Sequence, residues 1–254
     1  MSRAILLLHG FLSEMNDFDS INDELLKRYD RVYRPILPGH GDADVCDYNK
    51  FNREDTFKVL LEAFDELAAE YDTIDVMGFS MGGALATYLS SVRSFNKLIL
   101  VSPANHYFNP KSLITSTVYA TKIFFALEKS IIKKDEAEKE AYYDMLGYFN
   151  GDRKASLGFT IRKYIKTYIW KAYKEFADIV RNCNKDLKEI KNETLILWGK
   201  LDQLVPEKSI QELYKMCTNE KSKLVIFDEY THLMLLSTNP QKIIDEILQF
   251  IDRK

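Results

Sequence analysis

Ser80 lies in a pattern of residues that can turn a hydroxyl group into a nucleophile. It is the centre of Gly78-Phe79-Ser80-Met81-Gly82, a G-x-S-x-G pattern between an apolar run at 74–77 and a helix-forming segment. In a sharp turn from a strand into a helix, glycines on either side of the serine allow the two elements to approach closely and leave the hydroxyl at the carboxyl end of the sheet. We therefore expect Ser80 to be a nucleophile, rather than an incidental serine in a glycine-rich turn.

A base must remove the proton of a serine hydroxyl, and a carboxylate must orient that base. Of the four histidines, His232 follows an apolar run at 223–227 after a short loop, so it should lie at the same sheet edge as the serine. His9 and His40 lie in glycine turns, and His106 begins an irregular segment. We expect His232 to be the base, against the alternative of a solvated loop histidine.

The orienting carboxylate should follow a strand that lies between these two positions in the chain. Asp202 comes after the apolar run at 194–198 and before Glu207, which belongs to the first turn of the next helix. The order Ser80, Asp202, His232 is the one expected on this kind of scaffold. We expect Asp202 to orient the imidazole, with stabilisation of a turn as the alternative role.

Acyl transfer also needs hydrogen-bond donors for the negative charge that develops on the carbonyl oxygen. The backbone amide of Met81, which begins the helix after the serine, should be one donor. The turn His9-Gly10-Phe11 follows the first apolar run. We expect the amide of Phe11 to be the second donor.

Six short apolar runs alternate with longer amphipathic segments, and this alternation has to position the residues named above. Continuous runs of this length, rich in β-branched residues, fit strands that are buried on both faces. The pattern predicts strands at 4–8, 32–36, 74–77, 97–101, 194–198 and 223–227, and helices at 19–29, 53–71, 83–92, 209–217 and 241–251. We expect an α/β fold with a doubly wound, mostly parallel sheet.

The alternation stops between residues 105 and 190, where the sequence predicts no buried strand. This segment holds 15 of the 32 aromatic residues of the chain. At about 85 residues it is too long for an ordinary crossover, so we expect a helical cap inserted into a core made of 1–104 and 191–254. Most of the aromatic residues should hold the cap together, while Phe79, Tyr107 and Phe108 should contact the substrate.

Composition narrows the class of protein. The 254 residues include 35 basic and 38 acidic side chains, a formal net charge of −3. This charge provides no positive electrostatic potential to attract the phosphate backbone of a nucleic acid, so a dedicated nucleic-acid-binding protein is not expected. Cys46, Cys183 and Cys217 form no C-x-x-C pair, so neither a zinc site nor a disulfide framework is indicated, and we expect a cytoplasmic protein. The early run at 4–8 is too short for a signal peptide, and no run has the roughly 20 apolar residues of a membrane span. We expect no metal, organic cofactor, nucleic-acid partner or stable membrane insertion, and a monomer or homodimer.

Together these motifs resemble the α/β-hydrolase superfamily, and within it small bacterial carboxylesterases and monoacylglycerol lipases with a capped core. The resemblance implies that Ser80, Asp202 and His232 form a catalytic triad and that the amides of Phe11 and Met81 form the oxyanion hole. The family's two leading antiparallel strands have no counterpart in this sequence, and Ser13 stands where many relatives have glycine. The matching segments, in family order, are His9-Gly10-Phe11, Pro38-Gly39-His40-Gly41, Gly78 to Gly83, Trp198 to Asp202 with Val205-Pro206, and Thr231-His232.

The sequence therefore predicts a serine hydrolase that cleaves carboxylic esters of small to medium apolar acyl groups through an acyl-enzyme. A peptidase or a carbon-carbon bond hydrolase would use the same three residues on the same scaffold. A non-catalytic receptor that binds ligands in the capped pocket is an alternative of another class, although a receptor has no use for a serine activated by a histidine.

Overall fold

The fold is built around one open sheet. The computed structural model describes residues 2–13, 16–41, 47–105 and 169–253. In these residues, six strands pair in the order β2-β1-β3-β4-β5-β6, and every pair is parallel. The strands are β1 (Arg3–Leu8), β2 (Arg31–Tyr33), β3 (Thr73–Phe79), β4 (Lys97–Val101), β5 (Glu193–Gly199) and β6 (Lys223–Phe227). The expected parallel sheet is thus confirmed.

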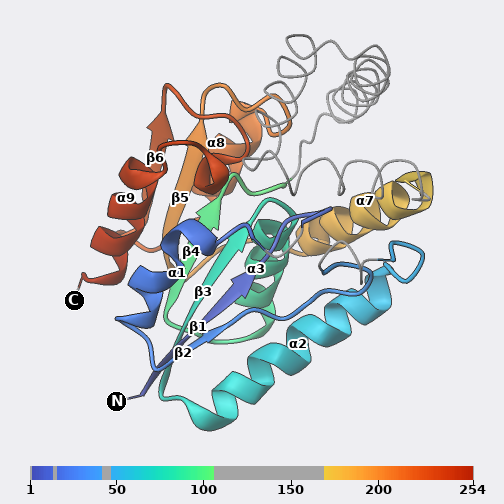
Figure 1. Ribbon diagram of the computed structural model, residues 1–254, viewed down its shortest axis with the longest axis horizontal. Coiled ribbons are helices and arrows are strands. Elements are labelled where there is room, and N and C mark those ends of the chain that lie inside the picture. The colour runs from blue at the N-terminus through green and yellow to red at the C-terminus, as the bar shows by residue number, and fades with distance from the viewer. Residues whose placement is uncertain (1, 14–15, 42–46, 106–168, 254) are drawn as a thin grey trace, which may run out of the picture.

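Helices cover both faces of this sheet, as expected for a doubly wound fold (Figure 1). One face carries α1 (Asp19–Leu26) and α9 (Gln241–Ile251), which follows a short 3-10 turn, η1 (Met234–Leu236). The opposite face carries α2 (Arg53–Glu70), α3 (Met81–Val92), α7 (Ile169–Lys185) and α8 (Glu207–Lys215). The sheet therefore lies between two helical layers. Its four inner strands, β1, β3, β4 and β5, are buried on both sides, whereas the edge strands β2 and β6 are partly exposed.

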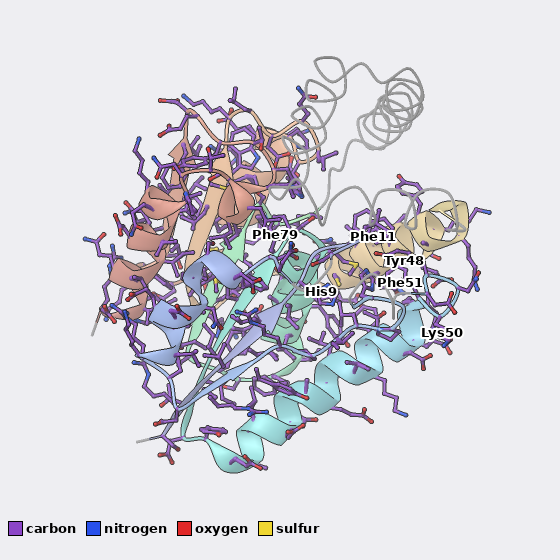
Figure 2. The ribbon with its side chains drawn as sticks, viewed as in Figure 1. His9, Phe11, Tyr48, Lys50, Phe51 and Phe79 are labelled. Carbon is purple, nitrogen blue, oxygen red and sulfur yellow. The ribbon has the colours of Figure 1, made fainter. Side chains whose placement is uncertain are left out.

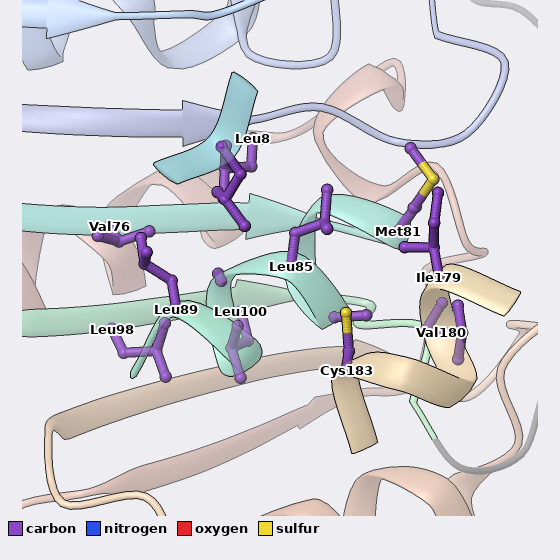
Figure 3. Close-up of a cluster of buried hydrophobic side chains, with 14 of the residues drawn as sticks. Leu8, Val76, Met81, Leu85, Leu89, Leu98, Leu100, Ile179, Val180 and Cys183 are labelled. Atoms are coloured by element: carbon purple, nitrogen blue, oxygen red, sulfur yellow. The ribbon is translucent and has the colours of Figure 1, made fainter. Parts of the chain in front are cut away.

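Successive side chains of a strand point to opposite faces of the sheet, and this divides the core into two clusters. In β1, Leu6 and Leu8 face the layer of α2 and α3, whereas Ile5 and Leu7 face the layer of α1 and α9. Figure 3 shows the first cluster, in which Val76, Leu98 and Leu100 from the strands meet leucines of α3 and side chains of α7. The residues named on both faces of β1 are at least nine-tenths buried, and so is Val76 of β3. This burial on both faces explains why these runs are continuously apolar in the sequence.

The register of the strands brings their carboxyl ends to one edge. Phe79 of β3 pairs with Val101 of β4, and Gly199 of β5 pairs with Phe227 of β6. The loops that follow β3, β5 and β6 therefore leave the sheet at the same edge. This edge is where ligands bind in open α/β sheets, and Ser80, Asp202 and His232 all belong to these loops.

Most element boundaries differ from the sequence-based expectation by one to three residues, and two of the differences bear on the site or have a local cause. The strand expected at 32–36 ends at Tyr33, because Pro35 has no N–H to donate to the ladder. The helix expected at 209–217 is α8, Glu207–Lys215, and begins directly after Pro206. Glu207 thus lies in the first turn of α8, as expected.

Helix α7 lies within the segment predicted to form a cap. Of that segment, the structure describes residue 105 and residues 169–190. Ala172, Phe176, Ile179 and Cys183 of α7 are buried in the same cluster as the strands. This part of the segment therefore contributes to the core. The division of the chain into a core and a cap stays a prediction.

Candidate active site

The turn between β3 and α3 holds Ser80 in a strained backbone conformation. Its φ and ψ angles are 52° and −115°, in a region that residues with a side chain rarely adopt. The serine N–H donates to the Val101 carbonyl oxygen at 3.0 Å, and its own carbonyl oxygen accepts from the Ala104 N–H at 2.9 Å. Contacts with the end of β4 thus hold the serine in place.

The glycines of the motif are required by close backbone approaches. A Cβ atom on Gly78 would lie 2.2 Å from the carbonyl oxygen of Gly82. A Cβ atom on Gly82 would lie 1.8 Å from the carbonyl oxygen of Leu8, which belongs to the neighbouring strand β1. Both contacts involve backbone atoms that cannot rotate away. The glycines therefore permit the close packing of strand against helix that the sequence pattern indicated.

A chain of hydrogen bonds joins the three polar residues predicted from the sequence. Nε2 of His232 lies 2.9 Å from Oγ of Ser80, and Nδ1 of His232 lies 2.8 Å from Oδ2 of Asp202. All three residues are more than nine-tenths buried. Because the Asp202 carboxylate can only accept, Nδ1 carries the imidazole proton and Nε2 presents its lone pair to the serine hydroxyl. The imidazole can therefore act as a base toward Ser80.

Asp202 is itself fixed by its own loop. Its Oδ1 atom accepts from the backbone N–H groups of Leu204 at 2.8 Å and Val205 at 2.9 Å. The turn-stabilising role and the imidazole-orienting role are thus held by different oxygens of one carboxylate. The two amides also fix which oxygen faces His232.

The two amides expected to form an oxyanion hole lie at the ends of β1 and β3. Within the described residues, neither the Phe11 N–H nor the Met81 N–H donates to a backbone or side-chain acceptor. Met81 is the first residue of α3, where N–H groups have no partner inside the helix. Both amides are therefore available to a ligand oxygen at this edge.

His9 fixes the peptide that carries the Phe11 amide. The Leu37 N–H donates to its Nε2 at 3.2 Å, so Nδ1 carries the proton and donates to the Gly10 carbonyl oxygen at 2.9 Å. That oxygen and the Phe11 N–H belong to one planar peptide and point in opposite directions. The Gly10 N–H, in turn, donates to Oδ2 of Asp17 at 2.8 Å. His9 thereby sets the direction in which the Phe11 N–H points.

His40 anchors the next residue of the same loop. The Leu12 N–H donates to its Nε2 at 3.2 Å, and its Nδ1 donates to the Pro38 carbonyl oxygen at 3.0 Å. Leu12 has a positive φ of 62°, an unfavourable conformation for leucine that this bond helps to hold. From the sequence, His9 and His40 are only residues of glycine turns, with no expected role at the site. Both join the loop at 9–12 to the loop at 37–40.

An aromatic cluster connects the first loop to α7. The ring of Phe11 stacks on that of Phe176, with centroids 4.8 Å apart and an interplanar angle of 20°. Phe51 and Tyr48 also lie near Phe11, with centroids at 5.6 Å and 6.4 Å (Figure 2). The Phe11 side chain therefore packs among aromatic rings while its amide remains at the sheet edge.

The three predicted substrate-contacting residues have different outcomes. Phe79 is 5% exposed, and its ring lies 5.3 Å from the His232 ring and close to Gly10. It supports the histidine and the first loop, and its contact with a substrate stays a prediction. Tyr107 and Phe108 lie outside the described residues.

The described residues contain no group of three or more potential ligands that could hold a metal ion. In that same part of the chain, no helix is long and apolar enough to cross a membrane.

Comparison with known proteins places this arrangement in a family. A carboxylesterase of Bacillus subtilis (strain 168) is 19% identical over 258 residues, which cover 99% of this chain and 93% of that protein. The 2-hydroxy-6-oxo-2,4-heptadienoate hydrolase of Pseudomonas putida is 24% identical over 249 residues, with coverage of 92% and 84%. A crystal structure of a hydrolase from Pseudomonas aeruginosa PA01 superposes with a TM-score of 0.66 at 18% identity, covering 99% of this chain and 91% of that one. The sequence pattern of the family described as alpha/beta hydrolase fold matches residues 3–237, so the chain belongs to the α/β-hydrolase family.

Proposed function

We propose that this protein is a serine hydrolase that cleaves carboxylic esters of small to medium apolar acyl groups. The observation that carries the proposal is the buried chain from Asp202 through His232 to Ser80, with bonds of 2.8 Å and 2.9 Å. Membership of the α/β-hydrolase family and similarity to a carboxylesterase support it. A receptor would gain nothing from a serine held in a strained turn against a base.

The reaction begins when Oγ of Ser80 attacks the ester carbonyl while Nε2 of His232 takes its proton. Asp202 holds the imidazole in the required tautomer and stabilises its positive charge. The Phe11 and Met81 amides would bind the oxygen that becomes negative. His232 then gives the proton to the departing alcohol, which leaves an acyl-enzyme, and a water activated by the same histidine releases the acid.

A cavity beside α7 supports the choice of an apolar acyl group. It has a volume of about 710 Å³, within the range of small-molecule sites. Tyr173, Phe176, Ala177 and Val180 of α7 contribute to its lining. Phe176 also stacks on Phe11, so one side chain of the cavity wall contacts the loop that carries one of the expected oxyanion amides.

Labelling by a fluorophosphonate probe tests the assignment of the nucleophile. Wild-type protein should be labelled and should hydrolyse nitrophenyl esters, and Ser80→Ala should lose both properties while remaining folded. Ser102→Ala is the matched control, because Ser102 is a buried serine with positive φ just after β4 but has no histidine partner in the described residues. Failure of folded wild-type protein to react with the probe would favour the receptor alternative.

A second candidate is a carbon-carbon bond hydrolase, which the relative from Pseudomonas putida favours. The substrate in that relative's name is a keto acid without an ester, so its hydrolysis must break a carbon-carbon bond. A panel of nitrophenyl esters, aminoacyl amides and vinylogous diketones separates the reactions. Turnover of amides or diketones without turnover of esters would contradict the esterase proposal.

A further inference from the structure

Asn105 lies one residue beyond the backbone that fixes Ser80. The Ala104 N–H donates to the Ser80 carbonyl oxygen at 2.9 Å. Pro103 lies close to Gly83, because a Cβ atom added to Gly83 would lie 2.7 Å from Cβ of Pro103. Residues 103 and 104 are thus held against the first turn of α3. Asn105 follows by a single Cα step of about 3.8 Å.

The Asn105 side chain is buried and makes no hydrogen bond to a described residue. The residue is 1% exposed, and within the described residues neither Nδ2 nor Oδ1 has a hydrogen-bond partner. Buried amide groups are nearly always paired, because an unpaired one loses its hydration without compensation. An apolar side chain of similar size, such as leucine, would avoid that loss. The unpaired amide therefore indicates a partner that comes with a ligand.

The same asparagine lines the cavity beside α7. Among the described residues that line this cavity, the charged ones, Arg181 and Lys185, are exposed, so they belong to its rim. Asn105 contributes a buried neutral group that can both donate and accept. An ionised substrate group would favour the charged rim, whereas a hydroxyl can use both halves of the amide.

We propose that Asn105 determines substrate specificity by hydrogen-bonding a neutral hydroxyl group on the ester. This inference rests on the proposed function and adds to it a substrate class, namely esters that carry a free hydroxyl in either the acyl or the alcohol part. With such an ester bound, the amide makes hydrogen bonds that it lacks among the described residues. A matched ester with a methyl group in place of the hydroxyl leaves the amide unpaired and is discriminated against.

Two pairs of esters test the proposal and distinguish the two parts of the substrate. Ethyl 3-hydroxybutyrate is compared with ethyl 3-methylbutyrate for the acyl part, and 3-hydroxypropyl butyrate with butyl butyrate for the alcohol part. In wild-type protein, kcat/KM should favour the hydroxylated member of one pair by about tenfold, which corresponds to about 1.4 kcal/mol. In Asn105→Leu the ratio should fall to about one.

Asn182→Leu is the matched control. Asn182 lines the same cavity, but its Nδ2 already donates to the Asp178 carbonyl oxygen at 2.7 Å, so the ratio should remain at its wild-type value. Thermal unfolding shows whether each variant is folded, and Asn105→Leu should be at least as stable as wild type. A ratio near one in wild-type protein for both pairs would overturn the proposal. The proposal would also be overturned if Asn105→Leu kept the wild-type preference for the hydroxylated ester, or if Asn105→Leu and Asn182→Leu lost that preference equally.

Ligand-observed NMR on Ser80→Ala compares the same pairs as ligands that are not cleaved. The hydroxyl preference and its dependence on Asn105 are then measured even if the wild-type protein cleaves no ester. Fluorophosphonate labelling reports separately on the nucleophile. A failure of the proposed function and a failure of the Asn105 assignment therefore give different results.

Discussion

Substitution of Asp202 by asparagine tests how the loop after β5 controls the imidazole. Oδ1 of Asp202 accepts from the N–H groups of Leu204 and Val205, and Oδ2 accepts from Nδ1 of His232. In Asp202→Asn, the amide oxygen must take the Oδ1 position to keep both backbone bonds. The NH₂ group then faces His232, so Nδ1 must accept and the proton moves to Nε2. In that tautomer the imidazole cannot take the serine proton.

The size of the expected loss of activity follows from the two backbone hydrogen bonds to Oδ1. Turning the substituted side-chain amide over would place its NH₂ group against two N–H donors and leave both unpaired, at a cost of about 1–3 kcal/mol each. The inactive orientation is therefore favoured by about 2–6 kcal/mol, or about 30-fold to 10⁴-fold. Loss of the carboxylate charge beside the imidazolium lowers the rate further. We expect kcat to fall by about 10³-fold to 10⁴-fold with little change in KM.

Steady-state hydrolysis of a nitrophenyl ester measures this effect, with thermal unfolding as the check on folding. Asp202→Asn should unfold near the wild-type temperature, because both backbone bonds are kept. Glu207→Gln is the control, since Glu207 is the next acidic residue along the chain and is exposed in the first turn of α8. A folded Asp202→Asn variant that retained more than about a tenth of the wild-type kcat would refute the reasoning. An equal loss of activity in Glu207→Gln would reassign the acid.

Three further predictions concern the turn, the first loop and a cysteine. Gly82→Ala would place a Cβ atom 1.8 Å from the Leu8 carbonyl oxygen, so urea unfolding should show a loss of about 3 kcal/mol or more, or no folded protein at all. His9→Phe removes the bond that directs the Phe11 N–H, so kcat should fall by about 10²-fold while KM changes little, and an unchanged kcat would show that this amide is not a donor. Burial raises the pKa of Cys217 from 9.0 to about 11, so above pH 9 the thiol ionises in the unfolded chain before the folded one. The free energy of unfolding should therefore decrease as pH rises from 9 to 11, and Cys217→Ala should reduce that slope in urea titrations.

Sequence patterns predicted the elements that depend on local chemistry. The runs at 97–101 and 223–227 match β4 and β6 residue for residue. For β4 the reason is that a strand buried on both faces is a continuous apolar segment, whereas β6, at the edge of the sheet, is mostly half-buried. The strand expected at 32–36 was too long by several residues at its carboxyl end, since the apolar pattern outweighed the missing N–H of Pro35. Which segments pack against the sheet depends on long-range contacts and was harder to predict. Phe176 and Cys183 lie in a segment expected to be a cap, yet they are buried with the sheet.

The chemical inventory of the site was determined by the sequence alone. Glycine spacing around Ser80, and acidic and histidine residues after later strands, are local features that indicate a nucleophile, an acid and a base in chain order. Their meeting at one edge followed from the parallel sheet, because parallel strands present their carboxyl ends together.

Only the tertiary structure decided which groups direct that chemistry. His9 reaches the Leu37 amide, Phe11 stacks on Phe176, and Asp202 divides its two oxygens between a histidine and its own loop. Such partners are far apart in the chain or depend on the direction of a single peptide, so no residue pattern records them. The unpaired amide of Asn105 is of the same kind, because an absent hydrogen bond is visible only once the described neighbours are in place.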